Sequence, residues 1–224
     1  MLCNGKIKSN VVATQKIHEE YGGVVPEIAS KNHEKLILPI VKKSLKDANI
    51  NIDEVDAIAV TYGPGLVGSL LVGLNFSKGL SIGLNVPLIG INHLEGHLVS
   101  NYINKKNIIF PYICLLVSGG HTQIVLVEND KYKILAETVD DAAGEAFDKG
   151  AIILGLKYPG GPEIEKKALN GKLNKYDFPI PHVKSNPCNY SFSGLKTSLL
   201  YKIQNLDEKT LKIDYSYVFR NDIL

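Results

Sequence analysis

The sequence contains little cysteine and almost no arginine. Its three cysteines are Cys3, Cys114 and Cys188, and no two of them have the CxxC spacing of a metal or redox site. Thiols so few and so far apart exclude a disulfide scaffold and a cysteine metal site, and they indicate a reducing compartment. The first six residues lack the apolar stretch of a secretion signal. We therefore expect a cytoplasmic protein.

A strong net charge is also absent. The chain has 25 basic residues, of which only Arg220 is an arginine, against 23 acidic residues, for a net charge of +2. A dedicated nucleic-acid-binding domain usually carries a strongly basic patch, which this balance does not predict. Apolar residues make up 45% and charged residues 21% of the 224 residues, so the chain is globular and long enough for one large domain or two lobes.

One apolar run resembles a membrane span. Between residues 66 and 91 only Lys78 is charged, and the length would suffice to cross a bilayer. However, five glycines interrupt the run, as do Asn85 and Pro87. We interpret it as a buried helix, a turn at residues 85–87 and a short strand over residues 88–91, and we expect no membrane partner.

The order of elements predicts an α/β lobe over residues 1–106. A strand centred on Val11 and Val12 is expected up to about residue 15, followed by a helix that reaches residue 48 with Asn32 as its N-cap. A strand over residues 55–61 then ends in a Gly-Pro-Gly turn before the glycine-rich helix. A strand, a glycine turn, a helix and a strand in this order are typical of an α/β layer.

A second lobe is expected over residues 107–224. Apolar stretches at 112–117 and 123–127 predict a β-hairpin, and a third strand is expected over 132–139. Helices follow at about 146–154 and from Glu163. Apolar residues between Leu206 and Leu224 indicate a last helix that stops without a C-cap. This lobe therefore has three strands and no closing element.

The most pointed local motif is His93-Leu94-Glu95-Gly96-His97. Two histidines four residues apart lie on one face of a helix, so both imidazoles can reach one metal ion. In a zinc protease the glutamate directly follows the first histidine, whereas Glu95 lies on the wrong face here. Two histidines are an incomplete site by themselves, and half-buried structural histidines are the alternative.

Three further segments are ambiguous when each is taken alone. The hairpin tip Ser118-Gly119-Gly120 could hold an anion with its backbone N–H groups, or it could be an ordinary turn. The acidic run from Asp140 to Asp148 suits either a helix N-terminus or contacts to a ligand. Residues 191–197 are either an anion-binding helix start or a capped helix.

Together these segments resemble one family. The stretches that carry the resemblance are residues 22–30, 63–66, 92–97, 116–122, 140–149, 158–162 and 191–197. In this order they are similar to the bacterial tRNA N6-adenosine threonylcarbamoyltransferases, once called glycoproteases. The resemblance implies an actin-like, sugar-kinase-like ATPase fold of two ribonuclease-H-like lobes. It implies transfer of the threonylcarbamoyl group from threonylcarbamoyl-AMP to N6 of the adenosine beside the anticodon of tRNA.

The same resemblance implies roles for particular residues. His93 and His97 would be ligands of one divalent metal ion, iron or zinc. The adenylate would be lined by Leu116, Val117, Ser118, Gly119 and Gly120. The nucleoside would be contacted by Asp148, Gly161 and Glu165, the last of which stands where many relatives have aspartate. No nucleophile is implied. The implied partners are tRNA, a paralogous actin-like protein and a small ATPase.

The sequence departs from the family pattern at both ends. The opening strand hairpin of the family, its adenine loop and the aspartate that supplies a third metal ligand are not found. We therefore expect a first lobe without its opening hairpin, a second lobe without its C-terminal part, and an activity in doubt. The alternative is a non-catalytic fragment that binds proteins of the tRNA-modification complex. A sugar-kinase-like phosphotransferase shares the fold but gives the histidine pair no role.

Overall fold

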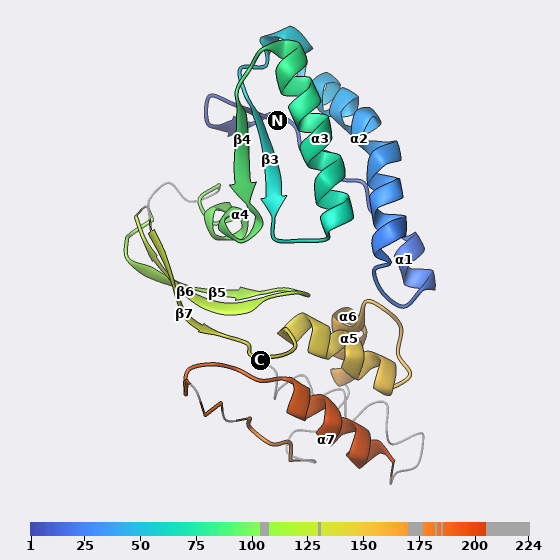
Figure 1. Ribbon diagram of the computed structural model, residues 1–224. Helices are drawn as coiled ribbons and strands as arrows, with labels where there is room; N and C mark the ends of the chain where they lie inside the picture. The colour runs from blue at the N-terminus through green and yellow to red at the C-terminus, as the bar shows by residue number, and fades with distance from the viewer. Residues whose placement is uncertain (104–107, 130, 170–176, 182, 185, 205–224) are drawn as a thin grey trace. The chain divides into compact units, whose positions relative to one another are not determined.

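The computed structural model describes residues 1–224 apart from 104–107, 130, 170–176, 182, 185 and 205–224. The chain divides into two compact units, Met1–Asn104 and Lys105–Leu224. Both units combine helices with strands (Figure 1), which confirms the predicted α/β class. The expected last helix, over residues 206–224, lies outside the described residues.

Among the described residues, the first unit contains most of the helical length. Its elements are β1 (Leu2–Cys3), β2 (Lys6–Ile7), α1 (Ile17–Glu20), α2 (Pro26–Ala48), the short 3-10 helix η1 (Ile52–Glu54), β3 (Ile58–Gly63), α3 (Val67–Leu84), β4 (Leu88–Asn92) and α4 (His93–Ser100). β1 and β2 form a small antiparallel hairpin, whereas β3 and β4 are parallel. Parallel strands need a crossover connection, and α3 provides it.

Helices α2 and α3 lie side by side along the β3–β4 pair (Figure 1). Gly68 allows their close approach, since a Cβ added there would lie 3.1 Å from Cβ of Ser30. Helix α3 ends at Asn85, whose backbone has φ 55° and ψ 43° in the left-handed region that asparagine tolerates. The predicted turn and strand after the glycine-rich helix are therefore confirmed.

Two expectations for the first unit are wrong. Residues 8–15 form no strand, and Val12 is 77% exposed, because a β-branched pair needs a neighbouring strand as well as propensity. Asn32 is not an N-cap, because α2 begins six residues earlier at Pro26. Proline suits the first helical position, where its missing N–H would have had no partner in the helix.

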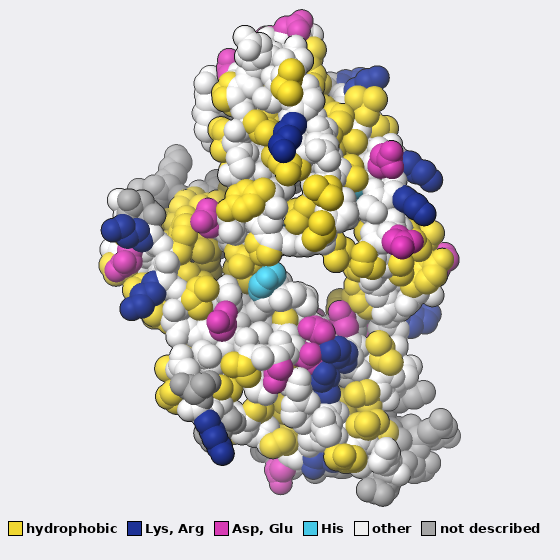
Figure 2. Space-filling model, viewed as in Figure 1, with side chains coloured by type: hydrophobic (Ala, Val, Ile, Leu, Met, Phe, Trp, Pro, Cys, Tyr) yellow, Lys and Arg dark blue, Asp and Glu magenta, His cyan; other side chains and the backbone are white. Residues whose placement is uncertain are grey.

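The expectation of a buried glycine-rich helix is also wrong. Only 6% of α3 is buried, although its mean hydropathy of 1.3 and its 18 residues would suit a membrane span by length and composition. One side packs against α2 and β3, while Val67, Leu71 and Ile82 are 71%, 49% and 81% exposed. Hydrophobic side chains accordingly lie on the surface over α3 (Figure 2).

The second unit is built on an antiparallel sheet in the order β5-β6-β7. Its elements are β5 (Tyr112–Val117), β6 (Thr122–Glu128), β7 (Lys131–Glu137), α5 (Ala143–Ile153), α6 (Gly160–Ala168) and α7 (Ser193–Ile203). The predicted hairpin and third strand are confirmed, with the pairs Tyr112↔Val127 and Val117↔Thr122 at the ends of the β5–β6 register.

The core of the second unit lies among its helices. Fully buried Ala146, Ile164 and Leu199 bring α5, α6 and α7 together. On β5, in contrast, Ile113 and Leu115 are 66% and 61% exposed. The alternation follows from the period of two in a strand, and it leaves one apolar face of the sheet open among the described residues.

Candidate functional site

The two histidines of the HxxxH motif lie on the first turns of α4. Asn92 caps this helix, because its Oδ1 accepts hydrogen bonds from the backbone N–H groups of Leu94 (2.9 Å) and Glu95 (3.4 Å). The cap fixes where the helix begins and therefore where His93 projects. Both imidazoles are exposed, so they are not the half-buried structural histidines of the alternative interpretation.

The imidazoles of His93 and His97 face each other. Their Nε2 atoms are 3.3 Å apart, and the rings meet edge to face with centroids 4.6 Å apart. Two nitrogen ligands at about 2.0–2.1 Å from a tetrahedral zinc ion would be about 3.3–3.4 Å apart. The pair therefore fits two positions of one metal ion. Among the described residues, no group of three or more His, Cys, Asp or Glu side chains is placed to hold a metal.

The other predicted site residues belong to the second unit, where the Ser118 turn (residues 118–121) joins β5 to β6. The hydroxyl oxygen of Ser118 accepts hydrogen bonds from the backbone N–H groups of His121 (3.0 Å) and Gly120 (3.4 Å). These are N–H groups that the sequence suggested for an anion. A bound anion would therefore have to replace the Ser118 hydroxyl, and the longer bond from Gly120 is the weaker of the two.

Helix α5 begins against this turn. The N–H of Gly144 donates to the carbonyl of Ser118 over 3.2 Å, and Thr122 Oγ1 accepts from the N–H of Ala143 over 2.9 Å. A Cβ on Gly144 would lie 2.7 Å from the Ser118 carbonyl oxygen and 2.9 Å from Cα of Gly119. Only glycine fits this approach, so the turn and the start of α5 pack backbone against backbone.

Asp148 lies one helical turn beyond Gly144, on the same face of α5. Its Oδ1 accepts a hydrogen bond of 2.7 Å from the N–H of Gly160, the first residue of α6. A carboxylate has lone pairs for further donors, so this bond leaves Asp148 able to accept from a ligand. Gly161 and Glu165 follow on one face of α6, four residues apart, and Glu165 is exposed.

The structure thus brings together most of the predicted residues of the second unit. The Ser118 turn, Asp148 and the start of α6 follow one another along α5. The two predicted strand residues differ in exposure. The side chain of Val117 is 48% exposed, whereas that of Leu116 is only 6% exposed, so Leu116 could contact a ligand only through its backbone.

The start of α7 is capped by a side chain from another segment. Asp140 accepts hydrogen bonds from the N–H groups of Phe192 (2.8 Å) and Ser193 (3.3 Å) and from the Ser191 hydroxyl (2.5 Å). Burial tends to raise the pKa of the Asp140 carboxyl, but these bonds outweigh it and lower the pKa below its ordinary value of 3.8. Of the two interpretations of residues 191–197, the capped helix is the one observed.

Sequence reasoning missed the ionic network beside this cap. Asp141 binds Lys149 (2.8 Å) and also contacts Lys196 of α7, and Glu145 binds Lys149 from the preceding turn (2.7 Å). Acidic and basic side chains accordingly lie together over α5 (Figure 2). Burial tends to raise the pKa of Asp141, but the hydrogen bonds and charges of Lys149 and Lys196 outweigh this effect. The pKa of Asp141 is therefore below its ordinary value. The i,i+4 spacing could have predicted Glu145–Lys149, but nothing local pairs residue 141 with residue 196.

Comparison with protein families gives a match over nearly the whole chain. Residues 6–223 match the family model described as TsaD, tRNA N6-adenosine threonylcarbamoyltransferase. Three relatives carry that same name. The proteins of Thermosipho africanus, Thermosipho melanesiensis and Christiangramia forsetii are 53%, 54% and 52% identical over 100%, 93% and 99% of this chain. The chain spans 69%, 64% and 64% of their respective lengths.

Two solved structures from Pseudomonas aeruginosa also match part of the chain. One is named YeaZ, and the other is described as an uncharacterized protein with similarity to peptidase YEAZ. Their identities are 18% and 19%, with TM-scores of 0.33 and 0.34. The matched region covers 46% and 45% of this chain, and 50% and 47% of the two solved chains.

Proposed function

Since the chain belongs to the family of tRNA N6-adenosine threonylcarbamoyltransferases, with the actin-like fold that this membership carries, we propose that it holds the metal-binding and adenylate-binding parts of such an enzyme. The observation that carries the proposal is the 3.3 Å pair of exposed imidazoles on α4. Their spacing suits a shared metal ion, and they stand within the matched residues. The metal would be iron or zinc, one ion per chain.

The proposed reaction is an acyl transfer. The exocyclic N6 amine of the adenosine beside the anticodon attacks the carbamoyl carbon of threonylcarbamoyl-AMP. A C–N bond forms, the C–O bond to the phosphate breaks, AMP leaves with that oxygen, and the amine loses one proton. A metal ion held by His93 and His97 would supply Lewis-acid polarisation of the carbamoyl or carboxylate oxygens. No side chain is assigned as nucleophile.

The residues of the second unit would bind and orient the adenylate. Gly119 and Gly120 allow a ligand to approach the backbone, and the N–H of Gly120 is the donor most easily turned outward from Ser118. Asp148 would accept from the ribose hydroxyls while it keeps α6 in place. Gly161 and Glu165 would extend the same surface along α6, and Leu116 and Val117 would border it.

Metal content and adenine-nucleotide binding, measured on the folded chain, test this proposal. We expect about one metal ion per chain and a nucleotide Kd in the micromolar range. His93→Ala should lose the metal, whereas Glu95→Ala, on another side of the same helix, should retain it. A folded chain that takes up neither metal nor nucleotide would contradict the proposal.

The proposed partners follow from the same reaction. The acceptor is a tRNA, and a paralogous actin-like protein and a small ATPase would complete the assembly, in the cytoplasm. A purified tRNA transcript should show measurable transfer only when these proteins are supplied.

A second candidate function is favoured by α3. Its exposed Val67, Leu71 and Ile82 lie on one face of the helix and form an apolar surface, as at a protein-binding face. In this alternative the chain is a non-catalytic binding module of the tRNA-modification complex. Capture of the paralogous partner by a chain that binds neither metal nor nucleotide would favour it. Loss of that capture in Ile82→Glu would locate the contact, with Ile134→Glu, the same change at an exposed isoleucine of the second unit, as the matched control.

A further inference from the structure

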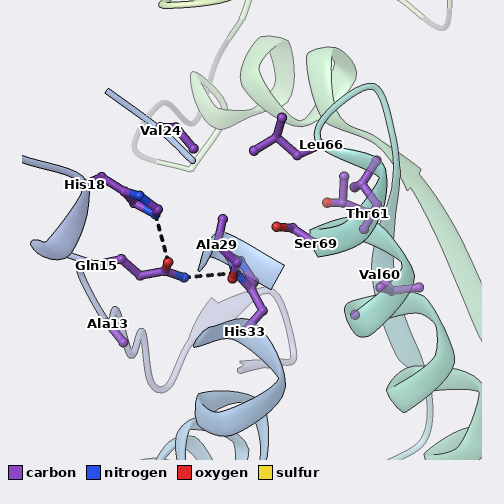
Figure 3. A pocket seen from close by; sticks show the side chains of 12 residues that line it. Ala13, Gln15, His18, Val24, Ala29, His33, Val60, Thr61, Leu66 and Ser69 are labelled. Carbon is purple, nitrogen blue, oxygen red and sulfur yellow. Dashed lines mark hydrogen bonds between the residues drawn. The ribbon is translucent and has the colours of Figure 1, made fainter. Parts of the chain in front are cut away.

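The first unit contains a pocket that the proposed function does not use. It has a volume of about 530 Å³ and lies between α2, α3, β3 and the segment that precedes α2 (Figure 3). Its apolar wall includes Val60, Leu66 and Leu70, and its polar wall is made of Gln15, His18 and His33. None of the lining side chains is acidic, lysine or arginine.

The polar wall is one connected set of hydrogen bonds. His18 is 8% exposed, and its Nδ1 accepts from the N–H of Val25 over 3.3 Å. A neutral imidazole that accepts at Nδ1 donates at Nε2, which is 3.1 Å from Oε1 of Gln15. Asn32 Nδ2 also donates to this oxygen, over 3.5 Å. These contacts fix which end of the Gln15 amide is oxygen.

The other end of the Gln15 amide then lacks a suitable acceptor. Its Nε2 is 2.9 Å from Nδ1 of His33, but this Nδ1 is also 2.7 Å from the carbonyl oxygen of Ala29. One ring nitrogen cannot accept from Gln15 and donate to Ala29 at once. Two acceptors at 2.7 Å repel each other, so Nδ1 carries a proton and donates to Ala29. The N–H groups of Gln15 therefore remain without an acceptor at His33.

Ser69 supplies a second donor from the opposite wall. Its hydroxyl oxygen is inaccessible to solvent and has no hydrogen-bond partner among the described residues. Figure 3 shows this hydroxyl and the Gln15 amide directed into the pocket from different sides of Ala29. A buried hydroxyl without a partner is costly, and a ligand that accepts its proton removes that cost.

We propose that this pocket binds a small uncharged molecule with a branched aliphatic body and a carbonyl oxygen that accepts from Ser69 or Gln15. The aliphatic part would pack on Val60 and Leu70, as in other ligand pockets that combine apolar walls with few polar groups. The lining holds no lysine or arginine, which favours a neutral amide over a carboxylate, because a buried carboxylate needs a compensating cation.

The probes are isovaleramide and isovalerate, which have the same shape and differ in charge. Saturation-transfer NMR on the intact chain should give a Kd of about 1 mM for isovaleramide. Isovalerate at about pH 8 should bind at least about tenfold more weakly, because its charge is not compensated.

Two substitutions that remove a donor test the assignment of the site. Ser69→Ala should weaken isovaleramide binding by about 2- to 12-fold, the usual effect of one hydrogen bond. Ser77→Ala, the same change on the same helix outside the lining, should leave binding within about twofold. If Ser69→Ala does not fold by circular dichroism, Gln15→Met serves in its place, with the same expected loss.

Three results would overturn the proposal. They are no saturable binding of isovaleramide to the folded chain, equal or tighter binding of isovalerate, and unchanged binding after the donor has been removed. None of these measurements involves metal or nucleotide, so the outcome is independent of the proposed transfer activity.

Discussion

Asp148 and Gly160 are joined by a hydrogen bond of 2.7 Å from the backbone N–H of Gly160 to Oδ1 of Asp148. The side chain proposed to contact the nucleoside therefore also holds the first turn of α6. Position 148 consequently couples the stability of the α5–α6 pair to the surface that would bind the ligand.

Replacement of this carboxylate should show how much the hydrogen bond to Gly160 contributes to stability. In Asp148→Ala the N–H of Gly160 loses its partner, and the free energy of unfolding should fall by about 0.5–2 kcal/mol, as for a lost helix cap. Asp148→Asn keeps an oxygen acceptor and should remain closer to the original protein. Urea denaturation followed by circular dichroism measures both. Equal losses in the two variants would mean that the hydrogen bond does not contribute.

Gly160 and Gly161 provide a matched pair of substitutions. A Cβ on Gly160 would lie 2.6 Å from Cα of Asp148 and 2.6 Å from the carbonyl oxygen of Phe147, whereas a Cβ on Gly161 meets nothing within 4 Å. Gly160→Ala should therefore lower the free energy of unfolding by about 1–3 kcal/mol or more. Gly161→Ala should leave it nearly unchanged. Thermal unfolding of the two variants side by side decides the point, and a tolerated Gly160→Ala would contradict the close packing of α6 on α5.

The second unit should lose stability in acid. The pKa values of Asp140 and Asp141 are lower in the folded chain than the ordinary 3.8, since their hydrogen bonds and ion pairs outweigh the effect of burial. A lowered pKa gives stability that is present above about pH 4 and is lost as the pH falls below that value. In Asp140→Asn the share of this pH dependence that comes from Asp140 should disappear, while the share of Asp141 remains. Denaturation at about pH 6 and pH 3 measures it, and an unchanged difference between the two pH values would contradict the assignment.

Metal affinity should depend on both imidazoles of α4. The described residues bring no third His, Cys, Asp or Glu to the proposed pair, so removal of either His93 or His97 should weaken Zn²⁺ binding by at least about tenfold. Competition with a chromophoric chelator gives the affinity. Retention of full affinity after loss of one histidine would place the metal elsewhere.

Two apolar residues of the first unit should respond differently to truncation. Ile82 is 81% exposed on α3, whereas Leu98 of α4 is 3% exposed. Ile82→Ala should change the free energy of unfolding by less than about 0.5 kcal/mol, and Leu98→Ala should lower it by about 2–5 kcal/mol. Chemical denaturation of both variants tests the exposure of α3. A large loss in Ile82→Ala would mean that this side chain is covered in solution, for instance by a second molecule.

Local sequence patterns were sufficient to predict the elements that are bounded by glycine or proline turns. The Gly63-Pro64-Gly65 turn correctly predicted the start of a helix, α3. The Ser118-Gly119-Gly120 turn correctly predicted the hairpin of β5 and β6. The strand expected at Val11 and Val12 failed because strand formation depends on a partner that propensity does not supply. The start of α2 was misplaced because Asn32 resembled a cap, while the proline six residues earlier was the true boundary.

In the candidate site, too, contacts between residues close in sequence could be predicted, and contacts between distant residues could not. The facing of His93 and His97 follows from their spacing on a helix, so the sequence alone could predict it. The bond between Asp140 and the start of α7 joins residues more than 50 positions apart, and no periodicity indicates it. The same holds for Lys196 beside Asp141. Whether the predicted ligand contacts are used stays a prediction.

The open surface of α3 has a consequence for the life of the protein in a cell. Chaperones bind exposed apolar surface, and proteases cleave chains that open. A partner that covered Val67, Leu71 and Ile82, as in the second candidate function, would therefore raise the abundance of the chain. In a cell where such a partner is scarce, the chain should be degraded more quickly and its steady level should be lower. Its steady level would then report the supply of its partner rather than its own rate of synthesis.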